Sequence, residues 1–127
     1  MTKEAIHAAD APQAIGIYSQ AIKCDKLVFL SGQIGLDPKS MTLVDGGFEH
    51  QLTQVISNLI QVAKAASGSL SDIVKVNVYL TDIVNFPKVN EIMEQYFSKP
   101  YPARAVVEVS GLPKGALVEI EAYMVLQ

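Results

Sequence analysis

The chain has 127 residues, half of them apolar, and this length and composition suit one compact domain spanning residues 1–127. The formal net charge is −3, and the ten basic residues are scattered lysines and one arginine, so no nucleic-acid partner is expected. No apolar run approaches the roughly 18 residues of a membrane span, and the charged N-terminus lacks the apolar core of a secretory signal, so we expect a cytoplasmic protein with no membrane partner.

Two strands open the regular part of the chain. The stretch QAIKCDKLVFLSGQIG predicts strands joined by a tight turn at Asp25–Lys26, the second running over Leu27–Gln33. Residues 37–47 are rich in turn formers. Apolar residues then recur every three or four positions over Phe48–Ala66, which predicts a helix of about five turns that stops at Gly68.

A two-residue period returns in DIVKVNVYLTD. It predicts a strand with one apolar face, Val74, Val76, Val78 and Leu80, and an opposite face of Ile73, Lys75, Asn77 and Tyr79. A second helix follows, with Asn85 as its cap and Pro87 in its first turn. Its predicted buried face is Val89, Met93, Tyr96 and Phe97. Two strands, Ala103–Val109 and Leu117–Leu126, close the chain.

Two amphipathic helices can cover only one face of a sheet, so the pattern predicts a two-layer α+β sandwich. The other face would then be open, and five apolar or aromatic residues are expected there: Ile73, Tyr79, Val106, Tyr123 and Val125. An open apolar face usually marks a subunit interface, which predicts a homo-oligomer.

Arg104 is the only arginine, and alternation puts it on the same side of its strand as Val106 and Glu108. Glu119 and Glu121 project opposite the core face of the last strand, so we expect Arg104 and these acids together on the open face. One interpretation is an intersubunit salt bridge between Arg104 and an acid. The other is that the guanidinium holds a substrate carboxylate through two parallel hydrogen bonds, which leaves an acid to hold a water or move a proton.

A metal site is not expected. Cys24, His7 and His50 are too few and lack ligand spacing. A single cysteine cannot form an internal disulfide, and Cys24 has no histidine near it in sequence, so an inert thiol is expected. Glu121 is expected to be a structural or solvated acid.

Four stretches, GIYSQAI, FLSGQIGLDP, DIVKVNVYLTDIVNFPKVN and PARAVVEVSGLPKGALVEIEA, occur in this order. With them the chain resembles the RidA/YjgF family of reactive-intermediate deaminases over essentially its whole length. The resemblance implies a chorismate-mutase-like fold, β-β-β-α-β-α-β-β, one mixed sheet, and a homotrimer with a cleft at each subunit interface. It also implies cofactor-independent hydrolysis of 2-iminobutanoate and of 2-iminopropanoate or its enamine 2-aminoacrylate to 2-oxo acids and ammonia.

The resemblance assigns catalytic roles to three residues. Arg104 matches the arginine that holds the substrate carboxylate, Glu119 the acid that positions the attacking water, and Tyr18 a tyrosine contributed to the cleft. Tyr18 alone could equally be an interface tyrosine.

Five residues match substrate-binding positions of the family: Ser31, Gly32, Phe86, Asn90 and Val106. Gly32 alone could be a bulge glycine. Many members have cysteine where this chain has Val106; the contact implied there is the main-chain N–H, which valine retains. Three other functions remain open: a non-catalytic module that binds small 2-oxo or amino acids, an endoribonuclease or translation inhibitor, and a chorismate mutase suggested by fold alone.

Overall fold

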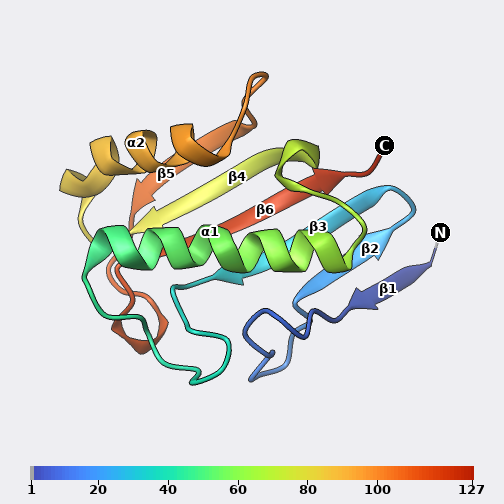
Figure 1. Cartoon of the computed structure of the whole chain (residues 1–127), viewed down its shortest axis with the longest axis horizontal. Helices are drawn as coiled ribbons and strands as arrows, with labels where there is room; N and C mark the ends of the chain where they lie inside the picture. The colour runs from blue at the N-terminus through green and yellow to red at the C-terminus, as the bar shows by residue number, and fades with distance from the viewer. Residues whose placement is uncertain (1) are drawn as a thin grey trace.

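A computed structural model describes residues 2–127 (Figure 1). Three strands, a helix, a strand, a second helix and two strands follow one another, which confirms the expected order. The elements are β1 Lys3–Ile6, β2 Ala21–Cys24, β3 Leu27–Gln33, α1 Phe48–Ala65, β4 Ile73–Leu80, α2 Phe86–Tyr96, β5 Ala103–Glu108 and β6 Val118–Val125.

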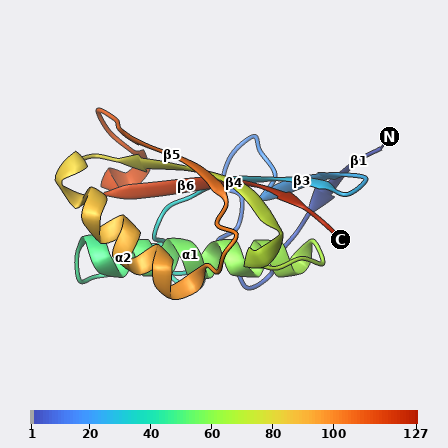
Figure 2. The same ribbon diagram turned by 90° about the horizontal axis from the view of Figure 1, so that it is seen from above.

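The strands form one sheet in the order β1-β2-β3-β6-β4-β5. All neighbours are antiparallel except β4 and β5, which are parallel. Both helices lie on the same face of this sheet, so the two-layer α+β sandwich is confirmed (Figure 2). No helix among residues 2–127 is long and apolar enough to cross a membrane.

The core lies between the helices and the sheet. α1 buries one apolar stripe, which includes Leu52, Ile56 and Leu59. The helix ends at Ala65, shortly before the predicted stop at Gly68. Ser67 takes the left-handed backbone (φ 70°), and the Gly68 N–H closes the helix end by donating to the Ala63 carbonyl at 2.8 Å. Gly68 has another role: a Cβ there would lie 2.7 Å from the Sδ of Met124, so glycine lets the chain pass close to the sheet.

α2 begins where it was predicted to begin, but it differs from its prediction in its capping bond and in one buried residue. Asn85 precedes the helix but makes no side-chain capping bond; instead Asp82 accepts a hydrogen bond from the Val84 N–H, one turn earlier. Tyr96 is 38% exposed, and the buried position belongs to Ile92. Tyr96 therefore lies at the margin of the helix layer, partly exposed to solvent.

A β-bulge changes the start of β4. Ile73 pairs with Met124 and Lys75 pairs with Tyr123, so Val74 is an extra residue on β4. The bulge turns Ile73 into the core, where it is 4% exposed, and leaves Val74 47% exposed. The sequence prediction had these two side chains reversed, because strict alternation does not anticipate an inserted residue.

The face assigned to Arg104 and Val106 is also wrong. In the parallel ladder Val76 pairs with Arg104 and Val78 with Val106, and paired residues share a face of the sheet. Since Val76 and Val78 are buried beneath the helices, both β5 side chains lie on the helix-covered face.

The other three residues expected on the open face do lie there. Tyr123 and Val125 are exposed there, and Tyr79 is half-buried. The Phe29 ring lies edge-on to Tyr123, with the ring centroids 5.6 Å apart. Leu27 and Val107 are also exposed on this face, which gives an apolar surface without a covering layer.

Candidate active site

Tyr18 lies on the loop between β1 and β2, and buried Gln20 shapes that loop. The Gln20 amide donates to the carbonyls of Ala8 (3.1 Å) and Pro12 (2.8 Å) and accepts from the Ala8 N–H (2.7 Å). At the end of the loop, the Ser31 hydroxyl donates to the Ser19 carbonyl at 2.6 Å. These bonds fix both ends of the segment, so the half-exposed Tyr18 is presented from an anchored loop.

Gly32 makes room for Glu119. Leu30 pairs with Ala122 and Gln33 with Ile120, so β3 carries a bulge at Ser31–Gly32. A Cβ on Gly32 would lie 2.5 Å from Oε2 of Glu119 and 2.8 Å from its Cδ. Gly32 is therefore a bulge glycine, and the absence of a side chain there leaves room for the Glu119 carboxylate.

Glu119 is a half-buried acid without a side-chain hydrogen bond among residues 2–127. Burial, and next the negative charge of Glu121, raise its pKa above the usual range. Glu121 is held differently, because its Oε2 accepts from Asn77 Nδ2 (2.9 Å) and from the Tyr79 hydroxyl (3.0 Å). Of the two neighbouring acids, Glu119 is the one available to a ligand.

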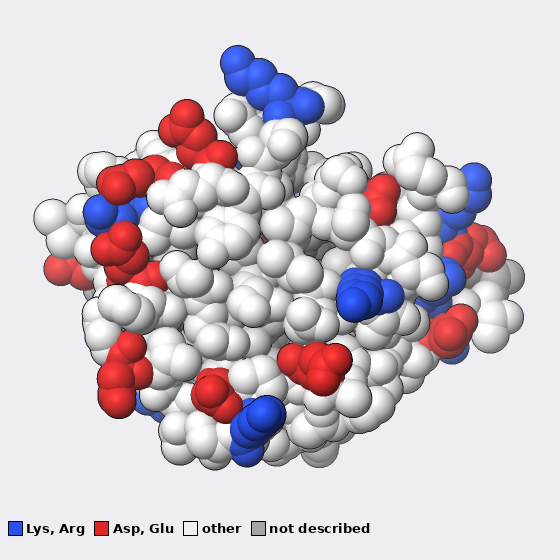
Figure 3. Space-filling model, viewed as in Figure 1, with Lys and Arg blue, Asp and Glu red and all other residues white. Residues whose placement is uncertain are grey.

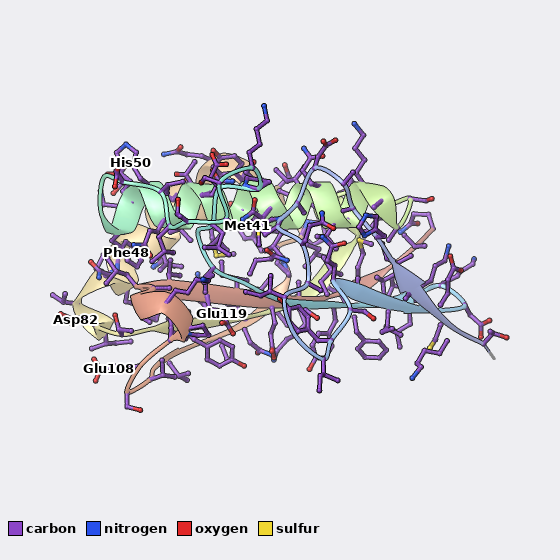
Figure 4. The ribbon with its side chains drawn as sticks, turned by 90° about the horizontal axis from the view of Figure 1, so that it is seen from below. Met41, Phe48, His50, Asp82, Glu108 and Glu119 are labelled. Carbon is purple, nitrogen blue, oxygen red and sulfur yellow. The ribbon has the colours of Figure 1, made fainter. Side chains whose placement is uncertain are left out.

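These side chains line a cavity of about 460 Å³, which we call the β3–β6 cleft. It contains four of the predicted site residues, namely Tyr18, Ser31, Gly32 and Glu119. Figure 4 shows Glu119 at the sheet, apart from Phe48 and His50 in the helix layer. Tyr18 could supply a hydroxyl and Glu119 a base to a molecule held there.

Arg104 lies elsewhere, against α2. Its guanidinium carbon is 5.4 Å from the centroid of the Phe86 ring, and Nη1 is 3.8 Å from the Sδ of Met93. A ring face and a thioether support a guanidinium without neutralising it. Among residues 2–127 the sole ion pair is Lys88–Glu91, so Arg104 keeps an unpaired charge.

A second cavity, of about 470 Å³, runs beside this arginine; we call it the α2–β5 cleft. Arg104 and Asn90 line it, together with Tyr101 and Met93. Val106 lines neither cleft, since its side chain packs against the core. Of the predicted substrate-binding residues on this side of the chain, Arg104 and Asn90 line the cleft and Phe86 contacts Arg104, whereas Val106 was predicted to act through its main-chain N–H and not its side chain.

The two clefts belong to opposite faces of the sheet. Glu119 pairs with Tyr79 on the open face, whereas Arg104 pairs with Val76 under the helices, and β4 runs between them. The expectation that Arg104 shares a face with Glu119 and Glu121 is therefore wrong. Within one chain the sheet separates the guanidinium from both acids.

Sequence reasoning did not assign several of the residues that line these clefts, among them Lys114, Met93 and Tyr101. Lys114 lines the β3–β6 cleft with a left-handed backbone (φ 58°), and Met93 and Tyr101 line the α2–β5 cleft. Lys114 and Tyr101 lie within the quoted stretch around Arg104 or directly before it, so proximity in sequence was a usable signal for them. Met93 was assigned only to the core, where it also lies.

Other candidate groups stay outside both clefts. Cys24 is a free, half-buried thiol in β2. His50 is exposed and hydrogen-bonded through Nδ1 to the Gly46 carbonyl at 3.0 Å. Among residues 2–127, no three His, Cys, Asp or Glu side chains cluster to hold a metal. On the face viewed in Figure 3, acidic and basic side chains are interspersed around a largely uncharged centre, without a continuous basic surface.

Known proteins match this chain along almost its full length. The family model described as Endoribonuclease L-PSP matches residues 8–126. A RutC family protein of Pyrococcus horikoshii is 48% identical over 120 residues, which is 94% of this chain and 95% of that protein. The protein named 2-iminobutanoate/2-iminopropanoate deaminase of Homo sapiens is 46% identical over 122 residues, 96% of this chain and 89% of that protein.

Solved structures of the same family also match the fold of this chain. RidA from an Antarctic Psychrobacter species has a TM-score of 0.94 at 47% identity, covering 97% of this chain and 99% of that one. E. coli TdcF with bound serine has a TM-score of 0.91 at 35% identity, covering 98% and 99%. The chain therefore belongs to the Endoribonuclease L-PSP family, which is the RidA/YjgF family its four sequence stretches indicate.

Proposed function

We propose that this protein hydrolyses 2-imino acids and their enamine tautomers, such as 2-iminobutanoate and 2-iminopropanoate, to 2-oxo acids and ammonia. The observation that carries the proposal is a pair of groups without a partner in the described part of the chain, residues 2–127: the guanidinium of Arg104, which has no ion pair, and the half-buried carboxylate of Glu119, which has no side-chain hydrogen bond. Relatives named for this deaminase activity, 44–46% identical to the chain, support it. The TdcF structure with bound serine shows that a similar fold holds a small amino acid.

Arg104 binds the substrate carboxylate. Its planar fork donates two parallel hydrogen bonds, an arrangement that a lysine ammonium cannot reproduce. Phe86 and Met93 hold the guanidinium in place without competing for its charge. The main-chain N–H of Val106, on the same strand, adds a donor to the same carboxylate. The bound substrate thereby presents its C2 carbon in a fixed orientation.

Glu119 activates the water. It takes one proton as the water oxygen bonds to C2 of the protonated imine, and the C=N double bond becomes a single bond. The carbonyl of Gly32 favours the protonated, electrophilic imine. Glu119 then returns this proton to the carbinolamine nitrogen, and the C–N bond breaks with its electron pair leaving on ammonia. The C–O bond becomes a double bond, the hydroxyl proton passes to Glu119, and the 2-oxo acid remains. Because the imine carbon is already electrophilic, no cofactor is needed.

The complete site requires two copies of the chain. Arg104 and Glu119 lie on opposite faces of one sheet, so both can reach one substrate if the α2–β5 cleft of one subunit adjoins the β3–β6 cleft of the next. The apolar open face around Phe29 and Tyr123 supplies a surface for such packing. A homotrimer with three equivalent sites between subunits satisfies both requirements.

Mixed oligomers test this proposal. Arg104→Ala and Glu119→Gln proteins are each expected to be inactive when a dehydratase generates the imine and 2-oxo acid formation is followed. After the two are unfolded and refolded together in equal amounts, about a quarter of the intersubunit sites should combine an intact arginine with an intact glutamate. About a quarter of wild-type activity should therefore return. No recovery from correctly assembled mixed oligomers would place the two residues outside a shared site.

The three alternative functions predict different experimental results. A binding module would bind 2-oxo or amino acids and leave imine decay unaccelerated. An endoribonuclease would cleave RNA as purified protein and lose cleavage on mutation of a site residue. The net charge of −3 and the single arginine disfavour binding of a polyanion such as RNA. Chorismate mutase chemistry needs more fixed cations for a dicarboxylate than Arg104 alone supplies.

A further inference from the structure

A second acid lies beside the proposed base. Glu119 and Glu121 are two residues apart on β6 and project from the same face, so their Cα atoms are about 7 Å apart. Both line the β3–β6 cleft. Two carboxylates in one cavity repel each other, and the charge of Glu121 contributes to the raised pKa of Glu119.

The two acids have unequal surroundings. Asn77 lies directly across from Glu121 in the β4–β6 ladder, and Tyr79 lies directly across from Glu119. The side chains of Asn77 and Tyr79 both donate to the same oxygen of Glu121, Asn77 at 2.9 Å and Tyr79 at 3.0 Å. Tyr79 therefore bonds to the diagonal neighbour Glu121 and not to Glu119, the residue directly across from it. The result is one carboxylate fixed by two donors and one left without a donor.

Few other charged or titratable groups face Glu119. β6 itself contributes Glu121 and Tyr123, and β4 contributes Tyr79 and Lys75. The loops contribute Tyr18 and Lys114, which line the same cleft, whereas β3 presents Ser31, Gly32 and Gln33 there, none of which titrates. Burial has the largest effect on the pKa of Glu119, and the charge of Glu121 is the next cause; both raise it.

We propose that Glu121 is a positioning residue for imine hydrolysis: its anchored negative charge makes Glu119 a stronger base towards the attacking water. This inference rests on the proposed function for its catalytic consequence. Glu121 does not contact the reacting atoms and exchanges no proton with the substrate. Its contribution comes from fixed charge, held in place by two strand neighbours, next to a carboxylate that must accept a proton.

The arrangement serves the chemistry of the reaction. A carboxylate with ordinary proton affinity is a weak base towards water at neutral pH, and a general base works best when its pKa approaches the working pH. Many enzymes obtain such a base from a pair of acids whose different environments push their proton affinities apart. In this protein Asn77 and Tyr79 hold Glu121 by hydrogen bonds, and the space beside Gly32 leaves Glu119 free.

Glu121→Gln tests the inference, because glutamine keeps the shape and an acceptor oxygen but removes the charge. Carbon NMR titration of the Glu119 carboxyl and the pH profile of kcat are measured on the assembled protein. We expect Glu119 to titrate at lower pH in the variant and the acidic limb of the kcat profile to move to lower pH with it. At neutral pH kcat should fall about threefold to tenfold, because the base is weaker.

Two further variants separate charge from structure. Tyr79→Phe removes one donor but keeps the Glu121 charge, so Glu119 should still titrate at higher pH than in Glu121→Gln. Glu49→Gln makes the same charge change in the first turn of α1, in the other layer, and should leave the Glu119 titration unchanged.

An unchanged Glu119 titration in Glu121→Gln would overturn the inference, and so would an equal shift in Tyr79→Phe. A shifted titration with an unmoved kcat limb would overturn its catalytic part. Absence of imine hydrolysis by the wild-type protein would instead refute the proposed function, and the NMR titration would still decide whether Glu121 controls the proton affinity of Glu119.

Discussion

A single methyl group added at Gly32 should disable Glu119 without unfolding the protein. The Cβ of alanine at position 32 would lie 2.5 Å from Oε2 of Glu119, whereas ordinary van der Waals contact begins at 3.4 Å. The carboxylate must therefore retreat by about 0.9 Å, the difference between these two distances. Since the nearest atoms belong to the far end of a flexible side chain, rotation of Glu119 can relieve the clash at little cost in stability.

Gly32→Ala should reduce catalysis much more than it reduces stability. A displacement of about 1 Å in a positioned catalytic group can reduce a rate by about 100-fold. We therefore expect Gly32→Ala to lower kcat for 2-iminopropanoate hydrolysis by about 100-fold, with a much smaller change in KM, because Arg104 is untouched. The assay couples a dehydratase that makes the imine to detection of the 2-oxo acid.

Gly111→Ala is the matched control. Gly111 has no heavy atom within 4 Å of the added Cβ and no positive φ, so the same substitution should leave kcat and stability unchanged there. Shortening the acid in the Gly32→Ala background, with Glu119→Asp, removes one methylene and should recover part of the lost rate. Full activity in Gly32→Ala, or an equal loss in Gly111→Ala, would refute the reasoning.

Three other substitutions test separate parts of the structure. Arg104→Lys loses the bidentate bond to the carboxylate, about 1.5–3 kcal/mol, so KM should rise roughly 10- to 100-fold; an unchanged KM in steady-state kinetics would contradict this. Glu119→Gln should be more stable than wild type at neutral pH. The raised pKa of Glu119 makes the folded state bind more protons than the unfolded state, so the free energy of unfolding falls as pH rises through that window. The difference should vanish in urea denaturation below the ordinary glutamate pKa. Gln20→Ala leaves buried groups of Ala8 and Pro12 without partners and should cost about 1–3 kcal/mol in the same measurement, with a raised KM because the Tyr18 loop loosens.

Some elements were predictable because their signals are local. The turn at Asp25–Lys26, the strand Leu27–Gln33 and the helix starting at Phe48 depend on spacing within a few residues, and the structure confirms them. The bulge at Val74 was not predictable, because its cause lies in the pairing with β6. Family motifs pointed to Glu119 and Gly32 together, but their close contact became visible only with the strands in register.

For Arg104, local sequence pattern predicted one feature correctly, and only the pairing of the strands supplied the other. Alternation alone established that Arg104 shares a side of its strand with Val106 and lies opposite Ala105 and Val107. It could not say which side meets the helices. The side with Ala103, Ala105 and Val107 is the more apolar, yet the single partly buried residue of this edge strand is Val106, on the Arg104 side.

The sequence by itself determined the order of elements, the amphipathic face of α1 and the set of candidate site residues. Only the tertiary structure decided where these side chains stand, because parallel pairing of β5 with β4 fixed the face of Arg104, while antiparallel pairing of β6 with β4 fixed that of Glu119. Register depends on contacts between residues distant in the chain, and a shift of one residue exchanges the two faces of a strand.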